Sequence, residues 1–421
     1  MRISTKSTFD IGSSQINSLQ GALNRTQMQL STNRRMLTPA DDPVASARAL
    51  EVTQSQSINT QFVTNRSNAK NALSQEENAL KSTGDLVQDV NELIVKAGNP
   101  TLTDKDRLSL ATELEGRITD MLGLANTADG AGGYLFSGYK STTMPFTPTA
   151  AGATYQGDQG QRTLQVGSAR SLPTSDAGST VFENNMTGNG TFVTAADPTP
   201  PPAPNNFTRG GSGIISAGTV TNAVALTGHK YSIDFTVVPA TPGVPAVSTY
   251  LVTDTTLGVT VPSPAAPAPY LAGKSISFDG LQFDIKGVPA DQDKFTVAPS
   301  AKESVFKTMT DLLGALRQSA SGEAGQARLT NSLNAAHTIL DTAYDNVLSV
   351  RSEVGSRMKE LDYLDSAGDD LDIQYATTLS DLQDLNVVKA ISLFTQQQTT
   401  LQAAQQSFTK VSNLSLFNYI N

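Results

Sequence analysis

The chain has 421 residues, 30 of them basic and 39 acidic, which gives a formal net charge of −9. This length allows about two or three domains, and the acidic balance argues against nucleic acid as a partner. The absence of cysteine excludes disulfides and thiolate chemistry, and the two histidines, His229 and His337, lie far apart in unlike segments. We therefore expect neither a metal site nor a cofactor.

The opening segment, MRISTKSTFDIGSSQINSLQ, is polar and lacks the apolar core of a secretion signal. No run elsewhere approaches the ~18 apolar residues that cross a bilayer. We expect no membrane insertion, and any secretion must use another export route.

Proline divides the chain into three parts. Of the 20 prolines, only Pro39, Pro43 and Pro100 lie outside the segment 141–300. Because proline breaks helices and suits turns, the middle predicts strands and loops while the flanks predict helices. The expected fold class is α+β: a long antiparallel helical bundle or coiled coil formed by the N- and C-terminal flanks, with a β-rich domain inserted in the middle. We expect this insertion to carry its own core.

The N-terminal end predicts a helix with one narrow apolar seam. An apolar residue recurs every seventh position, at Phe9, Ile16, Leu23, Leu30 and Leu37. The companion heptad positions turn polar at Thr26 and Asn33. Ordering about forty residues costs on the order of 40–80 kcal/mol of backbone entropy, whereas five buried apolar side chains return roughly 8–15 kcal/mol. We expect both chain ends to lack fixed structure in the monomer and to become rigid when neighbouring subunits surround them.

Two further helices are predicted in the upstream flank. The first begins at Asp42-Pro43, an N-cap followed by proline, and stops at Gly98-Asn99-Pro100. Its heptad stripe comprises Leu73, Leu80, Val87 and Ile94, interleaved with Ala69, Glu76, Thr83, Val90 and Ala97. The second begins at Thr103 and Asp106, which have the spacing of a capping box.

The middle segment contains two strong strand candidates. Tyr231 to Val238 alternates apolar and polar residues, and the region from Ser275 to Ile285 surrounds the turn Asp279-Gly280. The proline-rich stretches 197–204 and 262–269 predict exposed loops.

Carboxylates in the middle segment raise the question of an acid–base or calcium site. They are Asp158, Asp176, Asp234, Asp254, Asp279, Asp284, Asp291 and Asp293. They lack the periodicity of a calcium loop, and their spacing suits turns and solvated strand faces. We therefore expect no catalytic site. For sugar binding, the candidate aromatic residues are Tyr155 and Tyr250, although packing between strands is the favoured explanation of both.

The downstream flank predicts a second long helix in coiled-coil-like packing. One heptad series is Leu333, Leu340, Val347, Val354 and Leu361, and the other is Leu329, Ala336, Ala343 and Val350, interrupted by Arg357 before Leu364.

The C-terminal end carries a drifting apolar stripe. It comprises Leu371, Tyr375, Leu379, Leu382, Leu385, Val388, Ile391 and Phe394, and then Leu401, Phe408, Val411, Leu414 and Phe417. From Leu385 to the end, the only charged residues are Lys389 and Lys410. An uncharged coat with apolar groups on several faces favours a helix surrounded by copies of itself or relatives. The alternative is a surface helix or a disordered tail.

Several segments carry a family likeness. They are the opening MRIST, LSTNRRMLTPADDPVASARAL (30–50), GGYLFSGYKSTTMPF (132–146), YQGDQGQRTLQVG (155–167) and LQAAQQSFTKVSNLSLFNYI (401–420). Together they resemble the flagellin superfamily and, within it, the hook–filament junction family. This sequence departs from the family pattern at Asn33, where glycine is usual, and at Ala40, where serine is usual. Asparagine tolerates left-handed backbone, so we expect the turn at Asn33 to survive.

The resemblance implies a structural component of the bacterial flagellum and three domains. A terminal coiled-coil layer corresponds to 1–42 and 370–421, a helical bundle domain to 43–140 and 301–369, and an outer β-rich insertion to 141–300. Copies of the chain would form a ring between the first hook-associated protein and the flagellin filament. The assembly seam would comprise Phe9, Ile16, Leu23, Leu30, Leu37, Leu379, Leu382, Leu385, Ile391 and Phe394.

The resemblance also implies secretion, unfolded, through the flagellar type III export apparatus to the extracellular flagellum. A flagellar export chaperone would hold the C-terminal stripe of Leu401, Phe408, Val411, Leu414 and Phe417. Two other functions are open: a flagellin filament subunit, and a surface adhesin with a carbohydrate-binding β domain.

Overall fold

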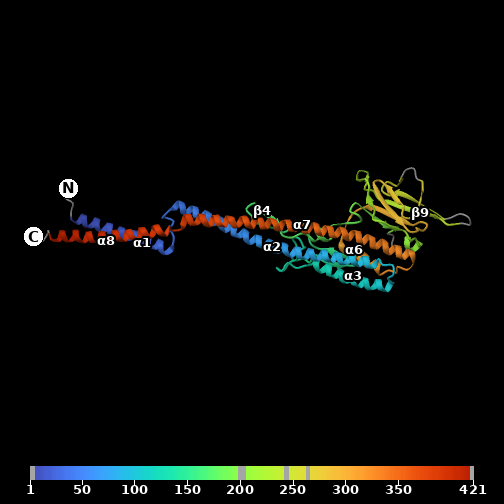
Figure 1. Ribbon diagram of the computed structural model, residues 1–421, viewed down its shortest axis with the longest axis horizontal. Helices are drawn as coiled ribbons and strands as arrows, with labels where there is room; N and C mark the ends of the chain where they lie inside the picture. Colours follow the sequence, from blue (N-terminus) through green and yellow to red (C-terminus); the bar gives the residue numbers. More distant parts are fainter. Residues whose placement is uncertain (1–4, 198–204, 241–245, 262–265, 418–421) are drawn as a thin grey trace. The chain divides into compact units, whose positions relative to one another are not determined.

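The computed structural model describes residues 5–197, 205–240, 246–261 and 266–417 (Figure 1). The α+β prediction is confirmed, because long helices come from both flanks and the described strands lie between Phe146 and Glu303. Internal packing divides the chain into two compact units. Unit 1 comprises Met1–Arg66, Val166–Ser168 and Asp362–Asn421, and unit 2 comprises Ser67–Gln165 and Ala169–Leu361.

The helices lie in both flanks and at short turns of the middle segment. They are α1 (Thr5–Thr32), α2 (Pro43–Ala97), α3 (Asp104–Ala125), α4 (Gly178–Phe182), α5 (Asn206–Arg209), η1 (Ala223–Ala225, a 3-10 turn), α6 (Val305–Leu316), α7 (Gly322–Gln383) and α8 (Val387–Phe417). None of these described helices combines the length and apolar character needed to cross a bilayer.

Predicted start and stop signals act as expected in the upstream flank. Asp42 accepts a hydrogen bond from Ala45 N at 3.0 Å, so α2 begins behind a side-chain cap. Thr103 and Asp106 form a reciprocal capping box at the start of α3. Asn33, directly after α1, adopts a φ of 53°, which confirms the left-handed turn expected there.

In unit 1, α1 and α8 run antiparallel, so both ends of the described chain lie at the same end of this unit (Figure 1). The C-terminal stripe is interrupted between α7 and α8, which its spacing does not reveal. Asn386 caps the new helix by accepting a hydrogen bond from Lys389 N at 3.1 Å. Opposite this break lies the break after α1: Arg35 N donates to Gln383 O at 2.8 Å, and Leu385 N donates to Asn33 O at 3.1 Å. The two breaks therefore share one set of backbone hydrogen bonds.

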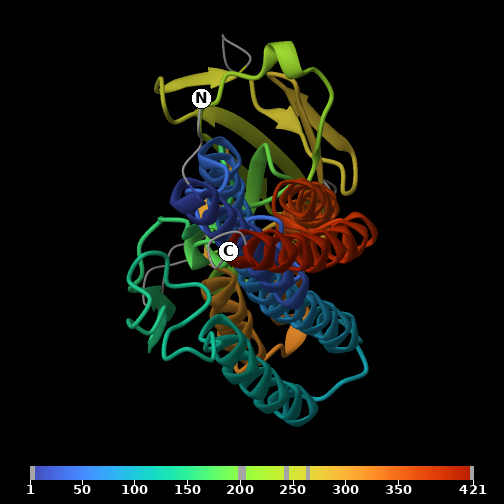
Figure 2. The same ribbon diagram turned by 90° about the vertical axis from the view of Figure 1, so that its left-hand side faces the viewer.

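In unit 2, α2 and α7 bury the predicted heptad stripes. Every stripe position from Ala69 to Ala97 is buried, and so is every one from Leu329 to Val354, with Leu361 beyond Arg357. The coiled-coil prediction is therefore confirmed for this part of the two helices. The shorter α3 and α6 lie side by side (Figure 2) and extend the bundle.

Four phenylalanine rings join the start of the middle segment to this bundle. Phe146 lies 5.1 Å from Phe306 of α6, measured between ring centroids, and Phe182 of α4 lies 5.4 Å from both Phe146 and Phe136. Asn346 of α7 donates to two carbonyl groups of α4 at 2.9 and 3.0 Å. Residues 141–182 thus share the core of the helices.

The strands form two larger sheets and several short pairs. They are β1 (Phe146–Thr149), β2 (Gly152–Tyr155), β3 (Thr163–Gly167), β4 (Arg170–Pro173), β5 (Asn185–Met186), β6 (Phe192–Ala196), β7 (Ile214–Ile215), β8 (Thr219–Val220), β9 (Tyr231–Val238), β10 (Val247–Asp254), β11 (Val259–Val261), β12 (Ala268–Pro269), β13 (Ser275–Phe278), β14 (Leu281–Lys286), β15 (Lys294–Pro299) and β16 (Lys302–Glu303).

The first sheet has the order β11-β10-β9-β15-β6, with β12 also on β10, and the second has β13-β14-β7, with β8 on β14. Alternating residues of β9 face one core that both sheets share, whose members run from Phe192 to Val297 in the chain. The predicted strand Tyr231–Val238 and the hairpin at Asp279-Gly280 are both confirmed. A separate core is therefore found from Phe192 onward, and we propose that the independent part of the insertion begins there.

The predicted proline-rich loops lie largely outside the described residues, at 198–204 and 262–265. One correction concerns Ala268 and Pro269, which form β12 against β10 and are not a loop. Proline is compatible with this position because β12 is a two-residue strand at the edge of the sheet.

Excising 192–299 should leave the helical bundle folded. Ser300 N donates to Thr191 O at 3.0 Å, so the two cut ends are adjacent, and a two-residue Asn-Gly turn can join them. We expect cooperative thermal unfolding of the remaining helices, measured by circular dichroism. Deleting 150–295 in its place removes Phe182 from the bundle core and should lower the unfolding midpoint strongly. Equal midpoints for the two deletions would contradict this boundary.

Candidate assembly site

The α1–α8 pair is held by a small number of specific contacts. The rings of Phe9 and Phe408 lie 5.0 Å apart, between centroids. Gly12 makes room for this contact, since a side chain there would lie 2.7 Å from Phe408 Cδ2. Thr26 is 3% exposed and hydrogen-bonds Gln397 Oε1 at 2.8 Å. Thr26, a polar position beside the predicted seam, is thus more deeply buried than the seam residues themselves.

The predicted seam and stripe residues lie at partly buried or exposed positions. Those that are half-buried are Ile16, Leu23, Leu30, Leu37, Leu379, Leu382, Leu385, Phe394, Leu401 and Phe408. Those that are exposed are Phe9 (53%), Ile391 (52%) and Val411 (53%). The side chains of Leu414 and Phe417 lie outside the described residues. Phe9 and Phe408 touch directly, whereas Leu379 and Leu382 belong to α7 and Leu37 to the segment between α1 and α2.

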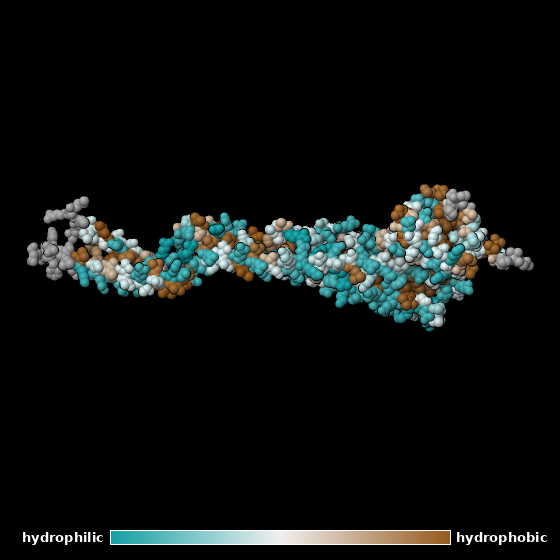
Figure 3. All heavy atoms as spheres, turned by 45° about the horizontal axis from the view of Figure 1, so that its top comes forward, coloured by the Kyte–Doolittle hydropathy of each residue, from teal (hydrophilic) through white to brown (hydrophobic). Residues whose placement is uncertain are grey.

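Other apolar side chains of this pair also point to solvent. They include Ile11, Met28, Val387, Val388 and Leu393. Figure 3 shows hydrophobic patches along the α1–α8 pair on the face in view. Exposed apolar groups gathered on one element mark an interaction surface, because isolated monomers seldom present them. Only Lys389 and Lys410 would have to be desolvated as charges on α8.

Charged residues fix the chain where α1 ends, through hydrogen bonds and an ion pair. Asp41 accepts hydrogen bonds from Leu37 N and Thr38 N, both at 2.9 Å, and pairs with Arg25. The Thr38 and Leu37 N–H groups hold the pKa of Asp41 below its usual range. Arg35 donates to Leu382 O at 2.7 Å. These contacts position the terminal helices without occupying their apolar faces.

A buried ionic cluster lies in unit 2, at the two stripe positions that hold charged residues. Asp176 N donates to Glu76 Oε1 at 2.8 Å, and Arg357 grips the Asp176 carboxylate with two hydrogen bonds, at 2.8 and 3.0 Å. Glu76 is 0% exposed, Asp176 is 2% exposed, and Glu76 Oε2 has no partner among the described residues. Burial, followed by the nearby Asp176 charge, raises the pKa of Glu76 to about 8. The sequence signal for this cluster was the presence of Glu76 and Arg357 at core heptad positions.

The two motifs 132–146 and 155–167 are joined to each other by hydrogen bonds. Asp158 accepts hydrogen bonds from Tyr139 N at 2.9 Å and Gly160 N at 2.8 Å, and the Tyr155 hydroxyl donates to Phe136 O at 3.0 Å. Gly138 adopts a φ of +70°, and a side chain there would collide with Asp158. These motif residues therefore serve the fold of unit 2.

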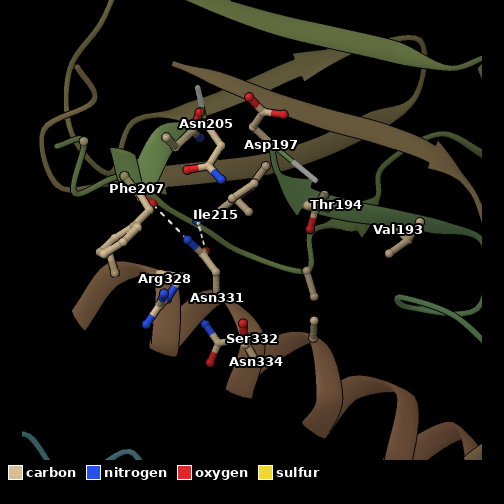
Figure 4. A pocket seen from close by; sticks show the side chains of 18 of the residues that line it. Val193, Thr194, Asp197, Asn205, Phe207, Ile215, Arg328, Asn331, Ser332 and Asn334 are labelled. Carbon is tan, nitrogen blue, oxygen red and sulfur yellow. Dashed lines mark hydrogen bonds between the residues drawn. The ribbon is translucent and has the colours of Figure 1, made fainter. Parts of the chain in front are cut away.

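A cavity of about 310 Å³ lies between β6, β7 and the start of α7 (Figure 4). Asn331 of α7 donates to Gly213 O and accepts from Ile215 N, both at 3.0 Å. The Arg328 guanidinium lies 4.4 Å from the centre of the Phe207 ring. Because Asn331 is already bonded to the strand, it fixes the sheet to the helix and does not point a free group at a ligand.

The aspartates considered above for catalysis make turn and strand contacts. Asp254 accepts from Thr256 N at 2.8 Å and pairs with His229 Nδ1 at 2.6 Å, and Asp279 accepts from the Tyr231 hydroxyl at 2.7 Å. In the part of the chain that the structure describes, no group of three or more His, Asp and Glu residues could hold a metal ion.

The likeness to known proteins includes the N-terminal helices. Residues 3–141 match the bacterial flagellin N-terminal helical region. Over 417 residues the chain is 29% identical to flagellar hook-associated protein 3 of Salmonella typhimurium, with 99% of each chain covered. The chain thus resembles hook-associated protein 3 over nearly its whole length, and its N-terminal third resembles the flagellins.

Solved structures agree with this resemblance. The flagellar junction protein FlgL from Legionella pneumophila is 29% identical, with a TM-score of 0.69 and coverage of 80% of this chain and 100% of that one. FlgL from Xanthomonas campestris is 28% identical, with a TM-score of 0.69 and coverage of 78% and 99%. The protein described here is thus a structural component of the bacterial flagellum, which is extracellular.

Proposed function

We propose that this protein forms the ring that joins the flagellar hook to the flagellin filament. The observation that carries the proposal is the likeness, over nearly the whole chain, to hook-associated protein 3. The exposed apolar side chains of α1 and α8 support it, because burying each one on assembly would contribute roughly 1.5–3 kcal/mol. On this proposal the protein has no catalytic activity.

The partners follow from a place between two tubular lattices. Copies of the chain lie side by side in the ring, the first hook-associated protein lies on the hook side, and flagellin lies on the filament side. The assembly seam defined above supplies the inner contacts, and the order of the two chain ends before assembly stays a prediction. The division into 1–42 and 370–421, 43–140 and 301–369, and 141–300 stays a prediction, and within 141–300 we place the start of the independent core at Phe192.

The proposed route to this place is the flagellar type III export apparatus. An export chaperone would cover the C-terminal stripe, whose members Phe408 and Leu401 are half-buried and Val411 exposed in the folded chain. Covering these groups in the cytoplasm would prevent premature assembly, since Phe408 packs on Phe9 of α1 in the folded chain.

Immunogold electron microscopy of purified flagella tests the proposal. We expect label confined to a short band at the distal end of the hook. A strain without the gene should release flagellin into the medium and lack filaments, and the wild-type gene should restore them. Label along the entire filament would instead identify a filament subunit, and filaments in the deletion strain would refute a junction role.

A further inference from the structure

The ionic cluster at Glu76 joins three segments of unit 2 that lie far apart in the sequence. Glu76 comes from α2, Arg357 from α7, and Asp176 from the chain just before α4. Gln161 adds a further hydrogen bond to Asp176, at 2.6 Å. Asp176 therefore joins the segment 156–178 to α2 through its backbone N–H and to α7 through its carboxylate.

The same segment is also closed upon itself. Thr174 N donates to Arg162 O at 2.7 Å, and Arg162 in turn pairs with Asp129 at 3.2 Å and donates to Tyr134 O at 3.0 Å. These bonds connect residues 161–162 to residues 174–176. Loss of the contact at Asp176 would therefore loosen residues 161–162 and 174–176 together, whereas Arg170 between them has its own ion pair with Glu360 of α7.

The centre of the cluster has one positive charge fewer than it needs to balance its two carboxylates. Glu76 and Asp176 are two carboxylates, and Arg357 is the cation that touches Asp176 directly. Arg162 is balanced by Asp129, and Glu353 lies beside Arg357 at 3.4 Å and adds negative charge. The neighbouring pair Glu77 and Arg351 is balanced. A buried carboxylate without a counter-charge is strongly disfavoured, and a bound proton removes that charge.

We propose that Glu76 keeps a proton in the folded protein and that this proton locks the segment 156–178 onto α2 and α7, so that rising pH loosens the segment. The unpartnered Oε2 atom is where the proton resides, because Oε1 accepts the hydrogen bond from Asp176 N. Neutral Glu76 leaves a compact group of one carboxylate and one guanidinium. Ionised Glu76 leaves two buried carboxylates facing one guanidinium.

The direction of the pH effect follows from proton binding. The docked segment holds Glu76 with a pKa of about 8, whereas the released segment exposes it to water at the ordinary value of 4.5. Between these two pH values, undocking of the segment is accompanied by loss of the Glu76 proton. The equilibrium constant for undocking therefore rises tenfold for each pH unit. The stabilisation is complete below pH 4.5, declines as pH rises, and is lost above about 8.

Hydrogen exchange read by mass spectrometry tests the proposal on the full-length protein. After correction for intrinsic exchange rates, we expect protection of 156–178 to fall about 50-fold between pH 6 and pH 8, with protection in α3 and α6 unchanged. Glu76→Gln mimics the protonated side chain and should abolish the pH dependence. Glu77→Gln, on the neighbouring half-buried ion pair, should preserve the wild-type profile.

A second measurement covers the case in which Glu76→Gln fails to fold. Carbon-13 NMR of the wild-type protein, labelled at glutamate carboxyl groups, should show one group that titrates near pH 8. Glutamate signals that all titrate below pH 6 would overturn the proposal. So would protection of 156–178 that is constant between pH 6 and pH 8, or an unaltered pH dependence in a folded Glu76→Gln protein.

Discussion

Replacing Phe408 by Asp should abolish assembly of the ring while leaving the bundle of unit 2 folded. The Phe408 ring lies against Phe9 and over Gly12 in the α1–α8 pair, and it makes no part of the buried core of unit 2. A carboxylate at this position would have to be desolvated without a cation, which costs several kcal/mol. Motility and electron microscopy of flagella report assembly, and thermal unfolding followed by circular dichroism reports the bundle.

Phe408→Leu is the matched control for this experiment. It keeps an apolar side chain of similar reach and should retain most of the assembly, because the contact with Phe9 depends on burial more than on ring geometry. Leu23→Asp on α1 should reproduce the Phe408→Asp result from the other helix. Equal losses of bundle stability and of assembly in Phe408→Asp would show that the terminal pair and the bundle are not separate.

The second large effect is expected for Arg357→Leu. This change leaves the Asp176 carboxylate buried without its cation, and breaking a buried ion pair by removing one partner costs about 3–5 kcal/mol. Urea unfolding of the full chain, followed by helix content, measures the loss. Leucine suits the heptad position, so a small effect would mean that packing compensates for the lost charge.

Arg351→Leu provides a matched comparison on the same helix. Arg351 pairs with Glu77 at 2.6 Å, but both side chains are more than a quarter exposed, so the loss should be about 1 kcal/mol or less. Adding Asp176→Asn to Arg357→Leu should restore part of the stability, because it removes the carboxylate charge that Arg357 balanced. If Arg351→Leu proved as destabilising as Arg357→Leu, the buried cluster would have no special weight.

Periodicity predicted the helices well, because a heptad stripe records which face is covered. The stripe from Leu329 to Val354 is buried throughout, and the caps at Asp42 and Thr103 lie where α2 and α3 begin. The strand Tyr231–Val238 was equally legible, since its alternation matches one buried face. In each case the signal is local in the sequence.

The contacts between distant segments could not be predicted in this way. Composition marks 141–182 as non-helical, but nothing in it shows that Phe146 and Phe182 pack on α6. Glu76 and Arg357 were visible as charged residues at core positions, yet Asp176, which joins them, lies about 100 residues from Glu76. Partner choice across such separations depends on the folded topology.

At the chain ends, the limits of the sequence have a different cause. Gly12 carries no apolar signal, although its missing side chain admits the Phe408 ring. The break between α7 and α8 has neither glycine nor proline to mark it, and only the N-cap Asn386 does so. The spacing of apolar residues reveals neither the role of Gly12 nor the helix break, because it reflects side-chain polarity and not backbone direction.

The hydrogen bond between Thr191 and Ser300 places the two ends of the sheet-bearing part next to each other, so that this part can be removed as one module. A module whose two ends meet at a single point can be exchanged for a shorter, longer or unrelated one without altering the path of the flanking polypeptide. Relatives are therefore free to diverge here at little cost to their shared framework. The same point is a natural place to graft a foreign domain for display on the cell's appendage.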